Sequence, residues 1–89
     1  MKAIVSVIGQ DKKGIIAKVT HTLFKLDINV EDISQTILQG HFTMIMVVSL
    51  DECKKHIEDI AIELNKVANE IGVTIQIQRD SIFNSMHNI

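Results

Sequence analysis

The hydrophobic side chains of this 89-residue chain change their spacing in a fixed order, and that order limits the possible folds. Residues 2–8 form a short run rich in β-branched side chains, which predicts a strand buried on both faces. Apolar residues then recur at helical spacing and predict a helix over about 13–27. Residues 29–39 and 41–50 show strand patterns on either side of Gly40, which marks the expected turn.

The second helical pattern is the clearest in the chain. Gly72 follows it and is expected to end the helix in the left-handed conformation. Val73, Ile75 and Ile77 then alternate with polar residues, which predicts a last strand with one buried face. The apolar residues of this second helix recur every three or four positions opposite a charged side: Ile57, Ile60, Ala61, Leu64, Val67, Ala68 and Ile71.

Two strand-helix-strand units in tandem make right-handed crossovers, so both helices should cover the same face of one sheet. The sequence therefore predicts an α+β sandwich of βαββαβ order, with an antiparallel sheet in the strand order 4-1-3-2. The other face of this sheet carries Ile45 and Val47, and we expect a second sheet or subunit to cover it.

The expected domain spans residues 1–79, and residues 80–89 form a short C-terminal tail. Ile82, Phe83, Met86 and Ile89 recur in this tail at helical spacing. Four apolar residues in ten do not suit a free tail. We therefore expect a short helix that packs on the domain or on a partner subunit.

Composition excludes several classes of protein. A net charge of −2 and the lack of Trp and Tyr disfavour nucleic-acid binding. The longest apolar stretch, residues 44–48, is far below the ~20 residues of a membrane helix. One cysteine, Cys53, cannot form an internal disulfide and agrees with a cytoplasmic location. A chain this small gains stability by pairing, so a homo-oligomer is expected.

Catalytic and metal-binding constellations are not evident in the sequence. The four histidines are scattered over two helices, a turn and the tail, so we expect no metal or other cofactor. The one arginine, Arg79, lies far from the first loop, where a phosphatase of this topology would need it. We therefore expect that the chain is not an enzyme.

The loop from Gly9 to Gly14 has features of a ligand site. Its glycines allow close approach to the backbone, and free N–H groups at the following helix start favour an anion such as a carboxylate. Asp11 could accept hydrogen bonds from an ammonium group, so together the loop suits a free amino acid. The alternative is structural: Asp11 caps the helix and the glycines only turn the chain.

The residues GQDKKGIIA at 9–17 and NVEDISQ at 29–35 resemble the ACT domain, the amino-acid-sensing module of many biosynthetic enzymes. The segments DISQT at 32–36, FTMIM at 42–46 and IFNSMH at 82–87 are similar to the stand-alone UPF0237 group. That group is similar to halves of the glycine cleavage system transcriptional repressor. The resemblance implies a ferredoxin-like fold, a homodimer and amino-acid binding at the subunit interface.

The resemblance also implies site residues. Asp11 and Asn29 match two asparagines that contact the ligand in the regulatory domain of phosphoglycerate dehydrogenase. Gly9 stands where that domain has a ligand-contacting histidine, so its specificity is not carried over. The structural alternative for Asn29 is a turn residue after Asp27. The candidate ligand-binding residues are Gly9, Gln10, Asp11, Lys13, Gly14, Ile15 and Asn29.

Two functions remain open at this point. The first is a non-catalytic regulatory domain that binds a small amino acid at a homodimer interface. The second is a protein-protein interaction module that acts on a regulator or enzyme without a small-molecule ligand.

Overall fold

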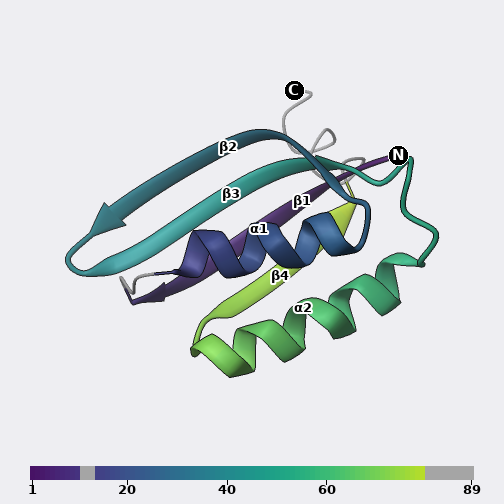
Figure 1. The fold of residues 1–89 in the computed structure, drawn as a ribbon. Helices are drawn as coiled ribbons and strands as arrows, with labels where there is room; N and C mark the ends of the chain where they lie inside the picture. Colours follow the sequence, from purple (N-terminus) through teal and green to yellow (C-terminus); the bar gives the residue numbers. More distant parts are fainter. Residues whose placement is uncertain (11–13, 80–89) are drawn as a thin grey trace.

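Four strands and two helices follow one another in the computed structural model, which describes residues 1–10 and 14–79 (Figure 1). Each element expected for this part of the chain is present, with α1 slightly shorter than its predicted span. The predicted helical tail lies outside the described residues. In chain order the elements are β1 Lys2–Gln10, α1 Ile15–Lys25, β2 Asn29–Leu38, β3 His41–Ser49, α2 Ile57–Ile71 and β4 Thr74–Arg79.

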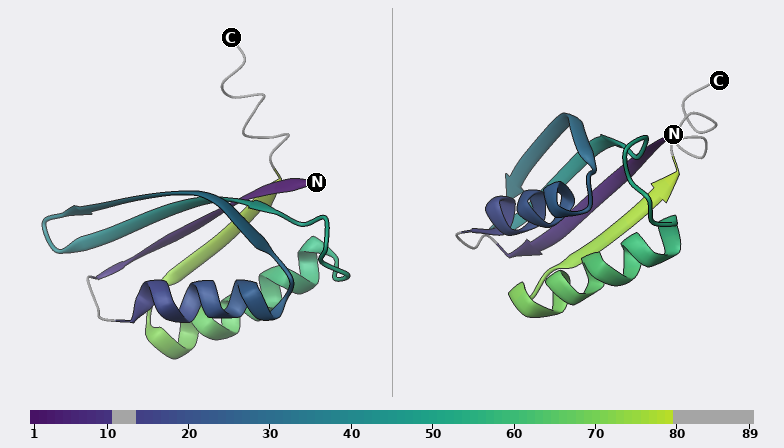
Figure 2. Two further views of the ribbon diagram at one scale, coloured as in Figure 1. Left: turned by 45° about the horizontal axis from the view of Figure 1, so that its top comes forward. Right: turned by 45° about the vertical axis from the view of Figure 1, so that its right-hand side comes forward.

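The strands form one antiparallel sheet in the order β2-β3-β1-β4, which confirms the predicted order. The central strand β1 pairs with β3 from Lys2 opposite Ser49 to Gln10 opposite His41. Its other side pairs with β4 from Ala3 opposite Arg79 to Ile8 opposite Thr74. Both helices lie on one face of this sheet, as the two views of Figure 2 show.

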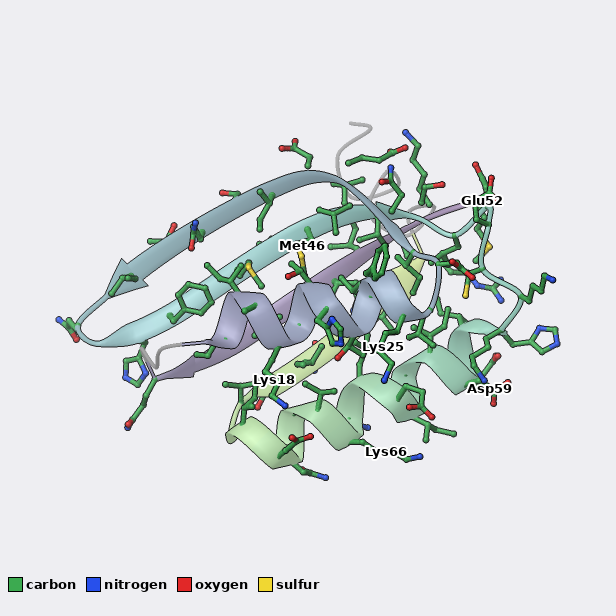
Figure 3. All side chains as sticks on the ribbon, viewed as in Figure 1. Lys18, Lys25, Met46, Glu52, Asp59 and Lys66 are labelled. Atoms are coloured by element: carbon green, nitrogen blue, oxygen red, sulfur yellow. The ribbon has the colours of Figure 1, made fainter. Side chains whose placement is uncertain are left out.

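The core lies between the helices and the sheet. Alternate residues of β1 and β3 point into it, which is the period expected for strands. Met46 lies between the sheet and α1, whereas Lys66 and Asp59 point outward from α2 (Figure 3). Lys18 reaches from α1 toward α2, and its Nζ lies 3.0 Å from Oε1 of Glu70. The fully buried large side chains are Leu23, Met44, Met46, Ile60, Leu64, Val5, Val7, Val19 and Val48.

The opposite face of the sheet is only partly buried, so the prediction that β1 is buried on both faces is wrong in part. Ile8 is 51% exposed and Ile45 is 43% exposed, whereas Ile4 is only 6% exposed. The physical reason is the right-handed crossover, which places both helices on the same side.

Left-handed residues end the helices and make the hairpin. Gln39 and Gly40 have φ angles of 51° and 80°, the combination of a type I′ turn between β2 and β3. Gly72 has a φ of 75° at the end of α2, as predicted. Asp27 takes this role after α1 with a φ of 59°, and its backbone N–H donates to the Phe24 carbonyl (3.0 Å).

Replacing Leu64 by Ala should lower the free energy of unfolding by about 2 to 5 kcal/mol, because Leu64 is buried in the core. Urea denaturation measures this loss. The matched control is Ile62→Ala on the outer side of the same helix, where the side chain is 55% exposed and the change should stay within about 0.5 kcal/mol. Equal losses in the two variants would contradict the packing described here.

Candidate functional site

The described part of the first loop lies at the end of β1 and the beginning of α1. Gly9 and Gln10 end β1, and Gly14 precedes α1 in the left-handed conformation (φ 87°). The Lys18 backbone N–H donates to the Gly14 carbonyl (2.9 Å), which closes the first turn of the helix. Gly14 has no side chain that could cap the first N–H groups of α1, so an anionic group could accept from them.

Asp11 and Lys13 lie outside the described residues, so their prediction stands untested. Ile15 is buried in the core, with only 3% of its surface exposed. Its side chain therefore serves packing, and only its backbone N–H can take part in a site.

Gly9 has a packing role that the sequence did not reveal. A Cβ atom at this position would lie 2.6 Å from Cγ1 of Val73, the residue that follows α2 and precedes β4. Real Cβ atoms essentially never come so close, so Val73 must shift if any larger residue replaces Gly9. This contact explains a glycine at position 9 without a ligand.

A hollow of about 470 Å³ lies beside the loop, at the end of the sheet where β1, β3 and β4 meet the end of α2. It contains Gly9 and Gln10 from the predicted site. Sequence reasoning missed His41 here, which pairs with Gln10 across the β1-β3 ladder. The hollow is lined by Ile8, Gly9, Gln10, His41, Gly72, Val73 and Thr74.

Asn29 lies at the opposite end of the sheet from the loop. It is the first residue of β2 and pairs with Ser49, which in turn pairs with Lys2 at the start of β1. Gly9 follows Lys2 by seven positions, so the two halves of the predicted site are about 23 Å apart along the strands. One protomer therefore does not bring Asn29 and the loop together.

The structural alternative for Asn29, a turn residue, is wrong. Asp27 occupies the left-handed position after α1, and the Ile28 backbone N–H donates to the Leu23 carbonyl (2.9 Å) to complete the helix end. Asn29 follows as an exposed residue of an extended edge strand. Its side chain is thus available for a contact that the turn does not require.

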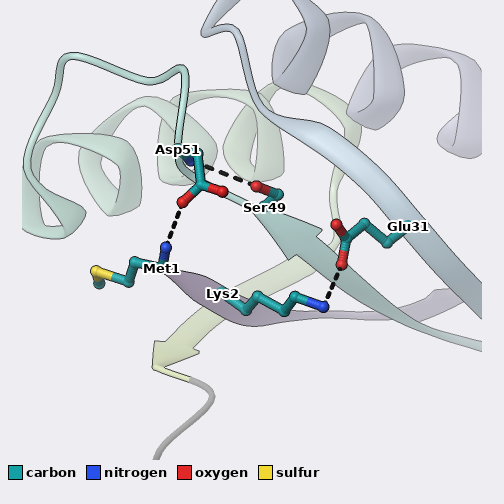
Figure 4. A network of polar contacts seen from close by, with 5 residues as sticks. All are labelled: Met1, Lys2, Glu31, Ser49 and Asp51. Carbon is teal, nitrogen blue, oxygen red and sulfur yellow. Dashed lines mark hydrogen bonds and ion pairs between the residues drawn. The ribbon is translucent and has the colours of Figure 1, made fainter.

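A charged network borders Asn29 at this end of the sheet (Figure 4). The amino-terminal ammonium of Met1 donates to the Asp51 carboxylate, and the Asp51 backbone N–H donates to Oγ of Ser49 (3.4 Å). Nζ of Lys2 lies 2.8 Å from Oε1 of Glu31 in an ion pair. The hydrogen bond from the ammonium and its charge are the main causes that lower the pKa of Asp51.

Four exposed apolar side chains lie on α1 and on the edge strand β2. We call them the α1-β2 patch: Ile16, Phe24, Ile33 and Ile37. Ile33 and Ile37 pair with Met46 and Phe42, so they lie on the helix side of the sheet. Phe24 is 77% exposed and Ile37 is 57% exposed, which is unusual for such large apolar side chains unless a partner covers them.

Residues 1–10 and 14–79 meet the requirements of neither a metal site nor a membrane-spanning helix. No group of three or more His, Cys, Asp or Glu residues there is arranged to hold a metal ion. Among the described helices, none is long and apolar enough to cross a membrane. The free thiol of Cys53 is half-buried, and its contact is the Lys55 carbonyl at 3.9 Å.

Comparison with known proteins gives one consistent answer. The ACT domain family model matches residues 2–78. A UPF0237 protein of Listeria innocua is 43% identical over 89 residues, and one of Clostridium acetobutylicum is 47% identical, each covering 100% of both chains.

Solved structures agree with the sequence matches. An ACT domain protein from Streptococcus pneumoniae has a TM-score of 0.84 and 43% identity, with 93% of each chain covered. A glycine cleavage system transcriptional repressor matches with a TM-score of 0.77 at 17% identity, over 86% of this chain and 45% of the other. At that identity the match to the repressor concerns the fold alone.

Replacing Gly9 by Ala should lower the free energy of unfolding by about 1 to 3 kcal/mol, because the new methyl group collides with Val73. The double variant Gly9→Ala with Val73→Ala should lose less than the two single variants together, since the smaller residue removes the collision. Urea denaturation of the four proteins gives the coupling. Strict additivity would show that Val73 is not the obstacle.

The pKa of the Asp51 carboxyl should lie below its ordinary value, because the amino terminus donates a hydrogen bond to the carboxylate and stabilises its charge. A lowered pKa in the folded state adds stability above that ordinary value, and this contribution is lost as the pH falls through the lowered pKa. NMR titration of the Asp51 side chain measures it. Acetylation of the amino terminus should return the pKa toward its ordinary value, and an unchanged pKa would contradict the ion pair.

Proposed function

Because the chain belongs to the ACT domain family, we propose that it is a non-catalytic, homodimeric regulatory domain that binds a small amino acid between subunits. The loop of one subunit and Asn29 of the other form the proposed site. The proposed compartment is the cytoplasm, with which the free thiol of Cys53 agrees.

The observation that carries this proposal is the separation of the two halves of the site within one protomer. The loop and Asn29 lie at opposite ends of the same sheet, and β2 is an edge strand that pairs on one side only. Antiparallel pairing of two β2 edges about a twofold axis near Ile33 would bring the partner's Asn29 to the Leu38 end of the strand. The first loop lies at that same end, because His41 pairs with both Leu38 and Gln10.

The α1-β2 patch supports the same arrangement. It flanks the β2 edge on the helix side, so two copies paired through β2 would place their patches beside each other. Burial of apolar surface contributes about 25 cal/mol per Å², which makes this patch a favourable contact for a domain with a small core. A twofold axis makes such an interface self-complementary.

The chemistry of the proposed site suits the two ends of an amino acid. The backbone N–H groups after Gly14 can donate to an α-carboxylate, which the partial positive charge of the helix start also favours. Asp11 and the side-chain oxygen of Asn29 can accept from the α-ammonium group. Gly9 adds no side-chain contact, so the proposed site recognises the ligand through its α-carboxylate and α-ammonium groups.

A protein-protein interaction module is the second candidate function. The observation in its favour is the apolar surface away from β2, where Ile8 and Ile45 are exposed on the face opposite the helices. In that case a regulator or enzyme contacts the domain and no small molecule is needed.

Calorimetry against the twenty amino acids should find at least one ligand with a dissociation constant between about 1 μM and 1 mM, that is, about −8 to −4 kcal/mol. Asp11→Ala and Asn29→Ala should each weaken its binding, since each removes a hydrogen-bond acceptor. Asn65→Ala is the matched control, because Asn65 is an exposed asparagine on α2, remote from the proposed interface. No ligand in the screen, or unchanged affinity in both site variants, would contradict the proposal.

A mixed dimer separates an intersubunit site from a site within one chain. A purified heterodimer of Asp11→Ala and Asn29→Ala chains retains one site in which both residues are intact only if the site combines two subunits. We expect calorimetry to return one ligand per heterodimer at the affinity of the unmodified protein. Complete loss of that affinity would place both residues in the same chain.

Replacing Ile37 by Glu should raise the dissociation constant of the homodimer at least about tenfold, equivalent to 1.4 kcal/mol, because it puts a charge in the proposed interface. Sedimentation velocity over a dilution series measures the change. Ile62→Glu is the matched control at an equally exposed isoleucine on the outer side of α2. A dimer unaffected by Ile37→Glu would show that β2 is not the contact.

A further inference from the structure

The sheet has a second apolar surface, on the side away from both helices. We call it the free sheet face; its apolar side chains are Ile4, Ile8, Ile45 and Val47. Ile4 lies opposite Val47, and Ser6 lies opposite Ile45, so the apolar residues of β1 and β3 are neighbours. Dimerisation through the β2 edges would leave this face uncovered, since both sheets would continue in one plane.

The free sheet face is uncharged along β1 from Ile4 to Ile8, whereas Lys2 lies at the start of β1 on the same face and forms an ion pair with Glu31. Between the apolar residues it presents the hydroxyl and amide side chains of Ser6, Thr43, Gln76 and Gln78. The helix side is different, because lysines and acidic residues cover its outer surface, including Lys18 and Lys66. An occupant of the free sheet face should therefore be apolar and carry no charge.

The chain itself provides such a segment next to this face. Residues 81–89, SIFNSMHNI, contain no Asp, Glu, Lys or Arg, and Ile82, Phe83, Met86 and Ile89 recur at helical spacing. The segment continues directly from β4, whose last residue, Arg79, pairs with Ala3 of β1. The apolar, uncharged composition of this segment and its start at the end of β4 both suit docking on the free sheet face.

The segment is long enough to extend from the end of β4 to Ile45. Ile45 lies three residues along the sheet and two strands across from Arg79, about 10 Å in each direction and about 14 Å along the diagonal. Ten residues in a helix span about 15 Å. The start of this path passes Ile4, which is 6% exposed although it lies on the face that neither helix covers.

We propose that residues 80–89 dock on the free sheet face of their own subunit, with the apolar side of the segment on Ile4, Ile45 and Val47. The segment shields this face from a second copy of the chain and from other proteins. A partner that uses the face must first displace it. This inference is independent of the amino-acid site, because Ile4, Ile45 and Val47 are not residues of that site.

Paramagnetic broadening tests the proposal on the full-length protein. A nitroxide is attached at Asn84→Cys in a Cys53→Ser background, and the isoleucine methyl signals are compared with those of the reduced label. The methyl signals of Ile4 and Ile45 should lose most of their intensity. Ile16 and Ile62 provide the internal control, because they are exposed on the helix side.

A second sample decides which subunit holds the segment. Isotope-labelled chains without nitroxide are mixed with unlabelled chains that carry it, so broadening there can come only from the partner's segment. We expect none at Ile4 and Ile45. Broadening of these signals in the mixed sample, equal broadening of Ile16 and Ile62, or no broadening at all would overturn the proposal.

Substitutions in the face complete the test. Ile45→Lys should remove the broadening at Ile4, because it puts a charge under the docked segment, whereas Ile62→Lys should leave it unchanged. Amide spectra verify that both variants keep the fold, which the partial exposure of both isoleucines favours. Broadening at Ile4 that survives Ile45→Lys in a folded protein would also overturn the proposal.

Discussion

The rest of the structure depends on the pairing of β1 with two neighbours at once. Along nine residues it hydrogen-bonds to β3, and along six of these it also hydrogen-bonds to β4. A shift of the register by one residue would turn every side chain of β1 to the other face of the sheet. The registers of β1 with β3 and with β4 must therefore direct the same alternate residues of β1 into the core. Ala3, Val5 and Val7 meet this condition, since all three are fully buried under the helices.

This pairing also decides where functional groups can meet. The first loop begins at the end of β1, and β2 begins at the other end of the sheet, because α1 runs back along the sheet between them. A site that uses both therefore needs two chains. In a two-layer fold of this kind the helices build the core, while the β2 edge and the free sheet face remain for contacts with other groups.

The elements and their order could be predicted from the sequence because each depends on local patterns. Each pattern involves residues close together in the chain: apolar residues alternate in β3 and recur at helical spacing in α2, and Gly72 follows directly after α2. The packing role of Gly9 could not be predicted, because Val73, which would collide with a side chain at position 9, is 64 positions away in the chain. The exposure of Ile8 was missed for a related reason, since burial depends on which side receives the helices. The ligand residues Asp11 and Lys13 stay predictions.

The irregularity in β2 decides what kind of assembly this sheet can form. The register of β2 with β3 shifts between Val30 and Asp32, so the ladder between these two strands runs without interruption only from Asp32 to Leu38. A sheet with two unpaired edge strands can form a filament when one edge strand pairs with the opposite edge strand of the next copy. Here the edges differ in regular length and in side chains, and a bulge of this kind disfavours indefinite growth. The proposed self-pairing of β2 would instead give a closed particle that cannot extend through that edge.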